Sequence, residues 1–101
     1  MKLMEAIEQA NFGAWIILKD GEVKGKIIAK YPQNGVGRLR VALWDWETYQ
    51  DIQEGWAGGY GYDKLSAALA GMSFNGIRLT DHPHDWERLL KEAGYKVQRL
   101  L

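Results

Sequence analysis

The 101-residue sequence contains no cysteine, and its charges balance. Without cysteine the chain has no disulfide framework, no thiolate nucleophile and no cysteine-ligated zinc site. With 13 basic and 13 acidic residues, it resembles neither a strongly basic nucleic-acid-binding protein nor a highly acidic mimic of DNA. The composition therefore favours small molecules and protein surfaces as partners.

The sequence also lacks any apolar run approaching about 18 residues, the length that a membrane-spanning helix needs. The N-terminal stretch "MKLMEAIEQANFG" has no continuous apolar core of the kind found in signal peptides. We therefore expect a soluble cytoplasmic protein with no membrane partner. Hydrophobic residues make up 47% of the chain, an ordinary globular proportion, and the length suits one domain over residues 1–101.

Turn signals and alternating hydrophobicity predict three β-strands in residues 14–46. The pair Asp20-Gly21 adopts positive φ at low cost and separates two apolar runs, which indicates a hairpin. In the second arm, a period of two directs the lysines outward and one set of residues inward, namely Val23, Gly25, Ile27, Ala29 and Tyr31. The stretch "RLRVALWDW" alternates in the same way, so the three strands form a predicted antiparallel meander.

Apolar spacings of three and four residues predict helices over 2–10, 62–72 and 83–93. A last strand is expected over 95–101, and Asn75-Gly76 indicates a turn or a small hairpin. For residues 52–56 two alternatives stay open, a fourth strand or an ordered loop. The order of elements predicts an α+β fold, in which a mainly antiparallel sheet (the three-strand meander plus the C-terminal strand) packs with two to three helices.

The segment "GWAGGYGYDK", residues 55–64, combines four glycines with one tryptophan and two tyrosines. A glycine-rich loop before a helix can bind phosphate, but neither the phosphate-loop pattern nor the full dinucleotide-binding pattern is present. The glycines are explained by a tight entry into the helix. Trp56 and Tyr60 are candidates for exposed aromatic anchors in recognition, with Lys64 beside them.

Catalytic and metal-binding residues are not indicated. "DHPHD" places His82 and His84 on either side of a proline at a predicted helix start, and capping and solvation explain these residues without a metal. The acidic segment 45–54 is read as solvated, and neither serine lies in a nucleophile motif. We therefore expect no catalytic residue, no metal and no cofactor.

A basic face is predicted on the meander. Residues 19–40 hold six basic and two acidic residues, whereas residues 45–54 hold four acidic ones. The candidate partner-binding residues on this face are Lys24, Lys26, Lys30, Arg38 and Arg40. Such lysines also guard strand edges in many proteins. A dipolar surface of this kind can steer a charged partner, and with Trp44 or Trp46 nearby it could contact single-stranded nucleic acid.

The stretch "GRLRVALWDW", followed by "GWAGGYGYDKLSAALAGM" and "LTDH", resembles small accessory proteins of bacteriophages and mobile elements in which a G-Y-G-Y-D-K-x-S-A-A motif recurs. The resemblance covers residues 37–82. The motif positions are Gly59, Tyr60, Gly61, Tyr62, Asp63, Lys64, Ser66, Ala67 and Ala68. Some phage proteins of this size are anti-CRISPR or other anti-defence factors, so the resemblance implies stoichiometric binding to a host effector complex without catalysis.

The leading hypothesis is thus a phage-encoded inhibitor that occludes the surface of a bacterial defence effector, either a protein or a ribonucleoprotein complex. It would act near Trp56, Tyr60 and Lys64, or through the basic face. The alternative is a nucleic-acid-binding accessory domain that uses the basic face. A third alternative, an enzyme or metal protein built on His82 and His84, has the least support.

Overall fold

The computed structural model describes residues 12–30, 39–46, 52–57, 64–80, 82 and 85–100, without the side chains of Ala57 and Lys64. Five antiparallel strands form one sheet in the order β4-β3-β2-β1-β7. Their bounds are β1 (Gly13–Lys19), β2 (Glu22–Lys30), β3 (Leu39–Asp45), β4 (Gln53–Ala57) and β7 (Lys96–Arg99). The remaining elements are α2 (Lys64–Leu69), the hairpin of β5 (Ser73–Phe74) and β6 (Ile77–Arg78), and α3 (Asp85–Glu92).

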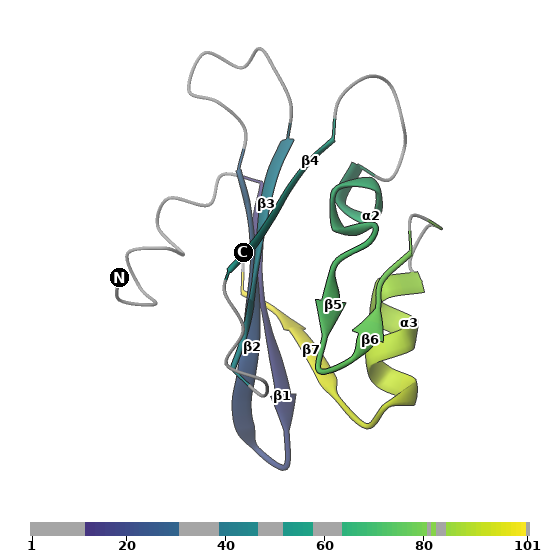
Figure 1. Cartoon of the computed structure of the whole chain (residues 1–101). Helices are drawn as coiled ribbons and strands as arrows, with labels where there is room; N and C mark the ends of the chain where they lie inside the picture. The colour runs from purple at the N-terminus through teal and green to yellow at the C-terminus, as the bar shows by residue number, and fades with distance from the viewer. Residues whose placement is uncertain are drawn as a thin grey trace.

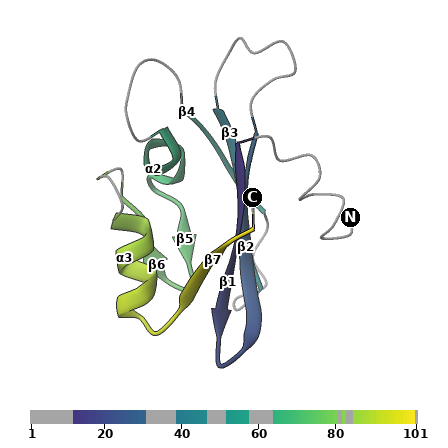
Figure 2. The ribbon, with the colours of Figure 1, turned by 180° about the vertical axis from the view of Figure 1, so that it is seen from behind.

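The helices and the small hairpin lie together on one side of the five-stranded sheet (Figure 1), and the view from behind shows the same two layers (Figure 2). The predicted α+β fold is confirmed, and the segment left open at 52–56 is a strand, β4. The helix expected over 2–10 lies outside the described residues. No helix in the described part of the chain has the length and apolar character needed to cross a bilayer.

Two-residue turns with left-handed backbone end the strands at the positions that the sequence predicts. Asp20 and Gly21 have φ of 54° and 79°, and Asn75 and Gly76 have φ of 47° and 80°. Two successive positive φ angles match the right-handed twist of hairpin strands. Both expected turns are therefore confirmed, and each joins two paired antiparallel strands.

A β-bulge in β2 makes one part of the predicted alternation wrong. Ile17 pairs with Gly25, but the next residue, Leu18, pairs with Val23, so β2 has one extra residue at Lys24. An inserted residue reverses the side on which the following side chain lies. Val23, which was expected to point inward, is consequently 37% exposed.

The core lies between the sheet and the helical layer. One face of the sheet contributes buried side chains from its three central strands, namely Trp15, Ile17, Ile27, Ala29, Leu39, Val41 and Leu43. The covering layer contributes Leu65, Leu69, Met72, Phe74, Leu79, Trp86 and Leu90. The rings of Trp15 and Trp86 meet edge to face with centroids 6.0 Å apart, a favourable aromatic geometry. On the opposite face of the sheet a smaller buried cluster of Ala14 and Ile28 packs with Trp44.

Strand β4 is attached to the covering layer at two points. At Gly55 an added Cβ would overlap the carbonyl oxygen of Ala68 in α2, so the helix and the strand approach more closely than a side chain allows. The Gln53 side chain bonds the Ser73 backbone twice: Nε2 donates to the carbonyl oxygen at 2.6 Å, and Oε1 accepts from the N–H at 2.8 Å. These contacts hold the edge strand in a defined position.

Candidate partner-binding surface

We call the sheet face opposite the helices the outer face. Residues paired across antiparallel strands share a face, and successive residues alternate between faces. The register therefore places on the outer face Ala14, Ile16, Leu18, Val23, Lys26, Ile28, Lys30, Arg40, Ala42, Trp44, Glu54, Trp56, Lys96 and Gln98. Within the described ranges no helix or further strand covers this face, and Figures 1 and 2 show the helical layer on the other side.

Three of the predicted site residues form one row across the outer face. Lys30 pairs with Arg40, and Arg40 pairs with Trp56. The Trp56 side chain is 53% exposed, and Arg40 Nη2 donates to Glu54 Oε1 at 2.6 Å. The sequence suggested two separate candidate sites, an aromatic loop and a basic sheet face. The pairing of β4 with β3 joins Trp56 to the basic residues on a single surface.

Lys26 does not project into solvent as expected. It is only 4% exposed, because its ammonium lies beneath two indoles, 4.4 Å from the ring centroid of Trp44 and 5.8 Å from that of Trp46. The backbone N–H of Trp46 donates to the Lys24 carbonyl oxygen at 2.8 Å, which holds this residue beside β2. Burial lowers the pKa of the Lys26 ammonium from its ordinary value. Lys26 therefore orients the two tryptophans through cation–π contacts and is not a free surface cation.

The pH dependence of stability tests this role of Lys26. Because its folded-state pKa is depressed, the cost of burying the charge is present at neutral pH and is relieved as the pH rises through the folded-state pKa toward the unfolded value of 10.5. Urea unfolding should therefore show the native chain gaining stability relative to Lys26→Met as the pH rises toward the ordinary lysine pKa of 10.5. Relative to the exposed control Lys91→Met, the native chain should show no such gain. A difference in the free energy of unfolding between the native chain and Lys26→Met that stays constant with pH would contradict the assignment.

Two other charged residues of the predicted surface already have partners. Lys24 Nζ lies 3.2 Å from Glu22 Oε2, across the bulge. Asp45, which was read as part of a solvated acidic segment, is 2% exposed and accepts a hydrogen bond from the Asn75 N–H at 2.7 Å. A polar side chain that is buried requires such hydrogen bonds. Asp45 therefore anchors the β5–β6 turn to the sheet.

The remaining candidate residues lie elsewhere. Tyr60, Arg38 and His84 fall outside the described residues, and Lys64 begins α2 with a side chain that is not described. Of the motif positions Gly59 to Ala68 singled out in the sequence, Ser66 and Ala68 are buried within α2. Among the residues that the structure describes, no three histidine or acidic side chains gather where they could hold a metal.

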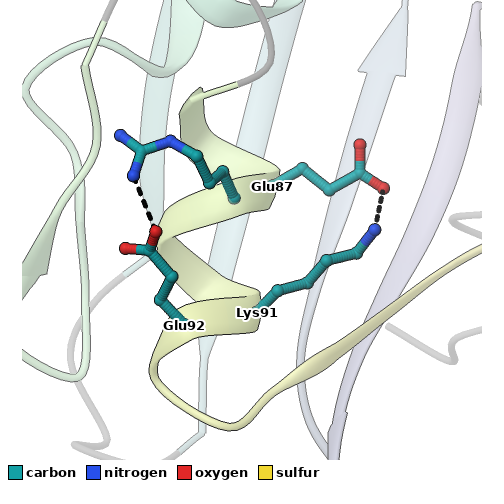
Figure 3. A pocket seen from close by; sticks show the side chains of 4 residues that line it. Glu87, Lys91 and Glu92 are labelled. Carbon is teal, nitrogen blue, oxygen red and sulfur yellow. Dashed lines mark hydrogen bonds and ion pairs between the residues drawn. The ribbon is translucent and has the colours of Figure 1, made fainter.

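A shallow pocket on α3 is lined by Glu87, Arg88, Lys91 and Glu92 (Figure 3). Arg88 Nη1 lies 2.8 Å from Glu92 Oε1, and Lys91 Nζ lies 3.6 Å from Glu87 Oε1. Hydrogen bonds to Glu92 and Asp85 raise the pKa of Arg88. The charges of the pocket thus neutralise one another along a solvated helix face, which leaves the outer face of the sheet as the better candidate site.

No family model matches the chain, and neither a curated protein nor a solved structure shows significant similarity to it. The sequence predicts the position of Trp56 next to Arg40 only in part. A strand over 52–56 would place Glu54 and Trp56 on one side, but no signal in the sequence predicts that this strand pairs with β3.

Proposed function

We propose that this protein is a non-catalytic binding protein that occludes a surface of its partner through the outer face of its sheet. The observation that carries the proposal is the exposed Trp56 beside Arg40, whose guanidinium is oriented by Glu54. Tryptophan and arginine are the residues most enriched at the energetic centres of protein interfaces. The contacts of Gln53 with the Ser73 backbone hold β4 before binding, so little ordering cost is added when Trp56 engages a partner.

The partner that we propose is a bacterial defence effector of the CRISPR-Cas type, a protein or ribonucleoprotein complex. The resemblance of residues 37–82 to phage accessory proteins supports this choice. The protein would then be phage-encoded and act in the cytoplasm of the bacterial host. Because occlusion involves no turnover, inhibition would saturate at a fixed ratio of inhibitor to effector.

A nucleic-acid-binding accessory domain is the second candidate, favoured by the tryptophans that lie among cations on the outer face. The state of the neighbouring lysines argues against it. Lys24 is paired with Glu22, and Lys26 is buried beneath indoles. Backbone binding needs cations that are free to neutralise successive phosphates. Affinity for a polynucleotide that falls steeply with rising salt would favour this second candidate.

Trp56→Ala is expected to abolish most of the binding while leaving the fold intact. The side chain is half exposed, so its loss should cost little stability, whereas truncation of an interface anchor costs about 2 kcal/mol, a roughly 30-fold weaker Kd. The test titrates the protein and its variant into cleavage assays of purified defence nucleases and measures the inhibition constant. Thermal melting of each variant verifies folding.

Two control variants accompany Trp56→Ala. Trp56→Phe keeps an aromatic anchor and should retain most of the inhibition, and Lys91→Ala, on the exposed surface of α3, should be neutral. Inhibition that persists in Trp56→Ala, or that continues to grow far beyond stoichiometric addition, would contradict the proposed function.

A further inference from the structure

Two like charges face each other across β2 and β3 on the outer face. Lys30 pairs directly with Arg40, and side chains in such pairs have Cβ atoms about 4.5–5.5 Å apart. Like charges at this distance destabilise a sheet. Arg40 has a carboxylate partner in Glu54 at 2.6 Å, whereas no acidic side chain in the described ranges pairs with Lys30. The row therefore holds more positive charge than its described neighbours neutralise.

The geometry leaves part of the Arg40 guanidinium available. Its contact with Glu54 joins one nitrogen, Nη2, to one carboxylate oxygen, and the Arg40 side chain is 57% exposed. A guanidinium has five N–H donors in a planar fork. One edge can thus remain on Glu54 while another receives a second carboxylate, with the Lys30 ammonium on the neighbouring strand.

We propose that the row Lys30–Arg40–Trp56 binds a carboxylate side chain on an acidic segment of the partner protein. The inference rests on the proposed function and names the chemistry of the partner at that site. The incoming carboxylate relieves the repulsion between Lys30 and Arg40 and forms charge-assisted hydrogen bonds with both. Trp56, adjacent in the row, packs against the apolar part of the same segment.

The charges around the row favour a protein carboxylate over a polynucleotide phosphate. The Glu54 carboxylate lies on the same face and offsets part of the positive charge of Arg40, so the row holds too little positive charge for a continuous chain of phosphates. The nearby cations do not extend the site, because Lys24 is paired and Lys26 is buried. A polynucleotide needs a track of free cations, while one isolated cationic pair matches one or two carboxylates.

The experiment compares two labelled probes at low salt, a decaglutamate peptide and a ten-nucleotide oligothymidine, by fluorescence anisotropy. We expect the protein to bind decaglutamate more tightly than oligothymidine. Lys30→Gln and Arg40→Gln should each weaken decaglutamate binding about tenfold, the loss typical of one charge-assisted contact. Lys91→Gln removes an equal charge on α3 and should leave the affinity unchanged.

Thermal melting separates a binding role from a structural one. Because Lys30→Gln removes a like-charge contact, it should raise the melting temperature or leave it unchanged, whereas a residue kept for structure would lower it. Tighter binding of oligothymidine, or equal loss of decaglutamate binding in Lys91→Gln, would overturn the inference. If the protein does not prefer decaglutamate but the Trp56→Ala variant no longer inhibits the nuclease, only this inference is wrong. If the peptide result holds but Trp56→Ala still inhibits, the proposed function fails instead.

Discussion

Replacing Gly55 with alanine is expected to lower the free energy of unfolding by about 3 kcal/mol, the upper part of the range for overpacking. An alanine Cβ would overlap the carbonyl oxygen of Ala68 and lie 2.8 Å from Met72 Cε. A flexible methionine end can move aside, but a carbonyl in a helix backbone cannot move without shifting α2. For a domain of this size the loss corresponds to a fall in melting temperature of at least roughly 12 °C, measurable by calorimetry or circular dichroism.

A double variant and a second glycine serve as controls for Gly55→Ala. Met72→Ala removes the movable neighbour but not the carbonyl, so Gly55→Ala should still destabilise a chain that already carries Met72→Ala. Gly21 has φ of 79° with open space around it, so Gly21→Ala should cost only the conformational strain of about 1–2 kcal/mol. A melting temperature for Gly55→Ala close to that of the native chain would show that α2 and β4 are not in close contact.

Phe74→Ala is expected to destabilise the protein by about 3–5 kcal/mol, the usual cost of truncating a fully buried phenylalanine. The side chain is 0% exposed, and its ring meets that of Tyr95 edge to face with centroids 5.1 Å apart. Its ring also lies over Gly25, where an added Cβ would approach Phe74 Cζ to 3.1 Å. Phe74 thus joins the small hairpin to both β2 and the start of the last strand. Chemical unfolding in urea measures the loss.

Variants that remove less buried side chain serve as controls for Phe74→Ala. Phe74→Leu keeps most of the buried volume and should lose clearly less stability than Phe74→Ala. Ile77→Ala, on the partner strand of the same hairpin, removes a side chain that is only partly buried and should cost less as well. A loss for Phe74→Ala no larger than the loss for Ile77→Ala would show that Phe74 does not form the joint described.

The two stability predictions bear on the proposed binding surface. Gly55 lies between Glu54 and Trp56, so a shift of α2 from β4 would also move the two outer-face side chains beside it. Phe74 packs beneath β2, two strands away from β4 in the sheet. At temperatures where both variants are folded, Gly55→Ala should therefore weaken partner binding more than Phe74→Ala does.

Local signals in the sequence determined the turns, the helix ends and the alternation of β3. Asp20-Gly21 and Asn75-Gly76 adopt the positive φ angles that these residues tolerate. Gly71 and Gly94 follow α2 and α3 with φ of 84° and 95°, the left-handed conformation in which glycine commonly ends a helix. These features depend on residues that are neighbours in the chain, so the sequence is sufficient to predict them.

Only the tertiary structure decided the composition of the outer face. The bulge at Lys24 placed Val23 outward, two indoles from β3 and the turn after it covered Lys26, and the pairing of β4 with β3 set Trp56 beside Arg40. Each outcome depends on which strands pair and in which register. A shift of one residue in register would reverse every side chain of a strand, and that choice is made by packing against distant segments such as α2 and the β5–β6 hairpin.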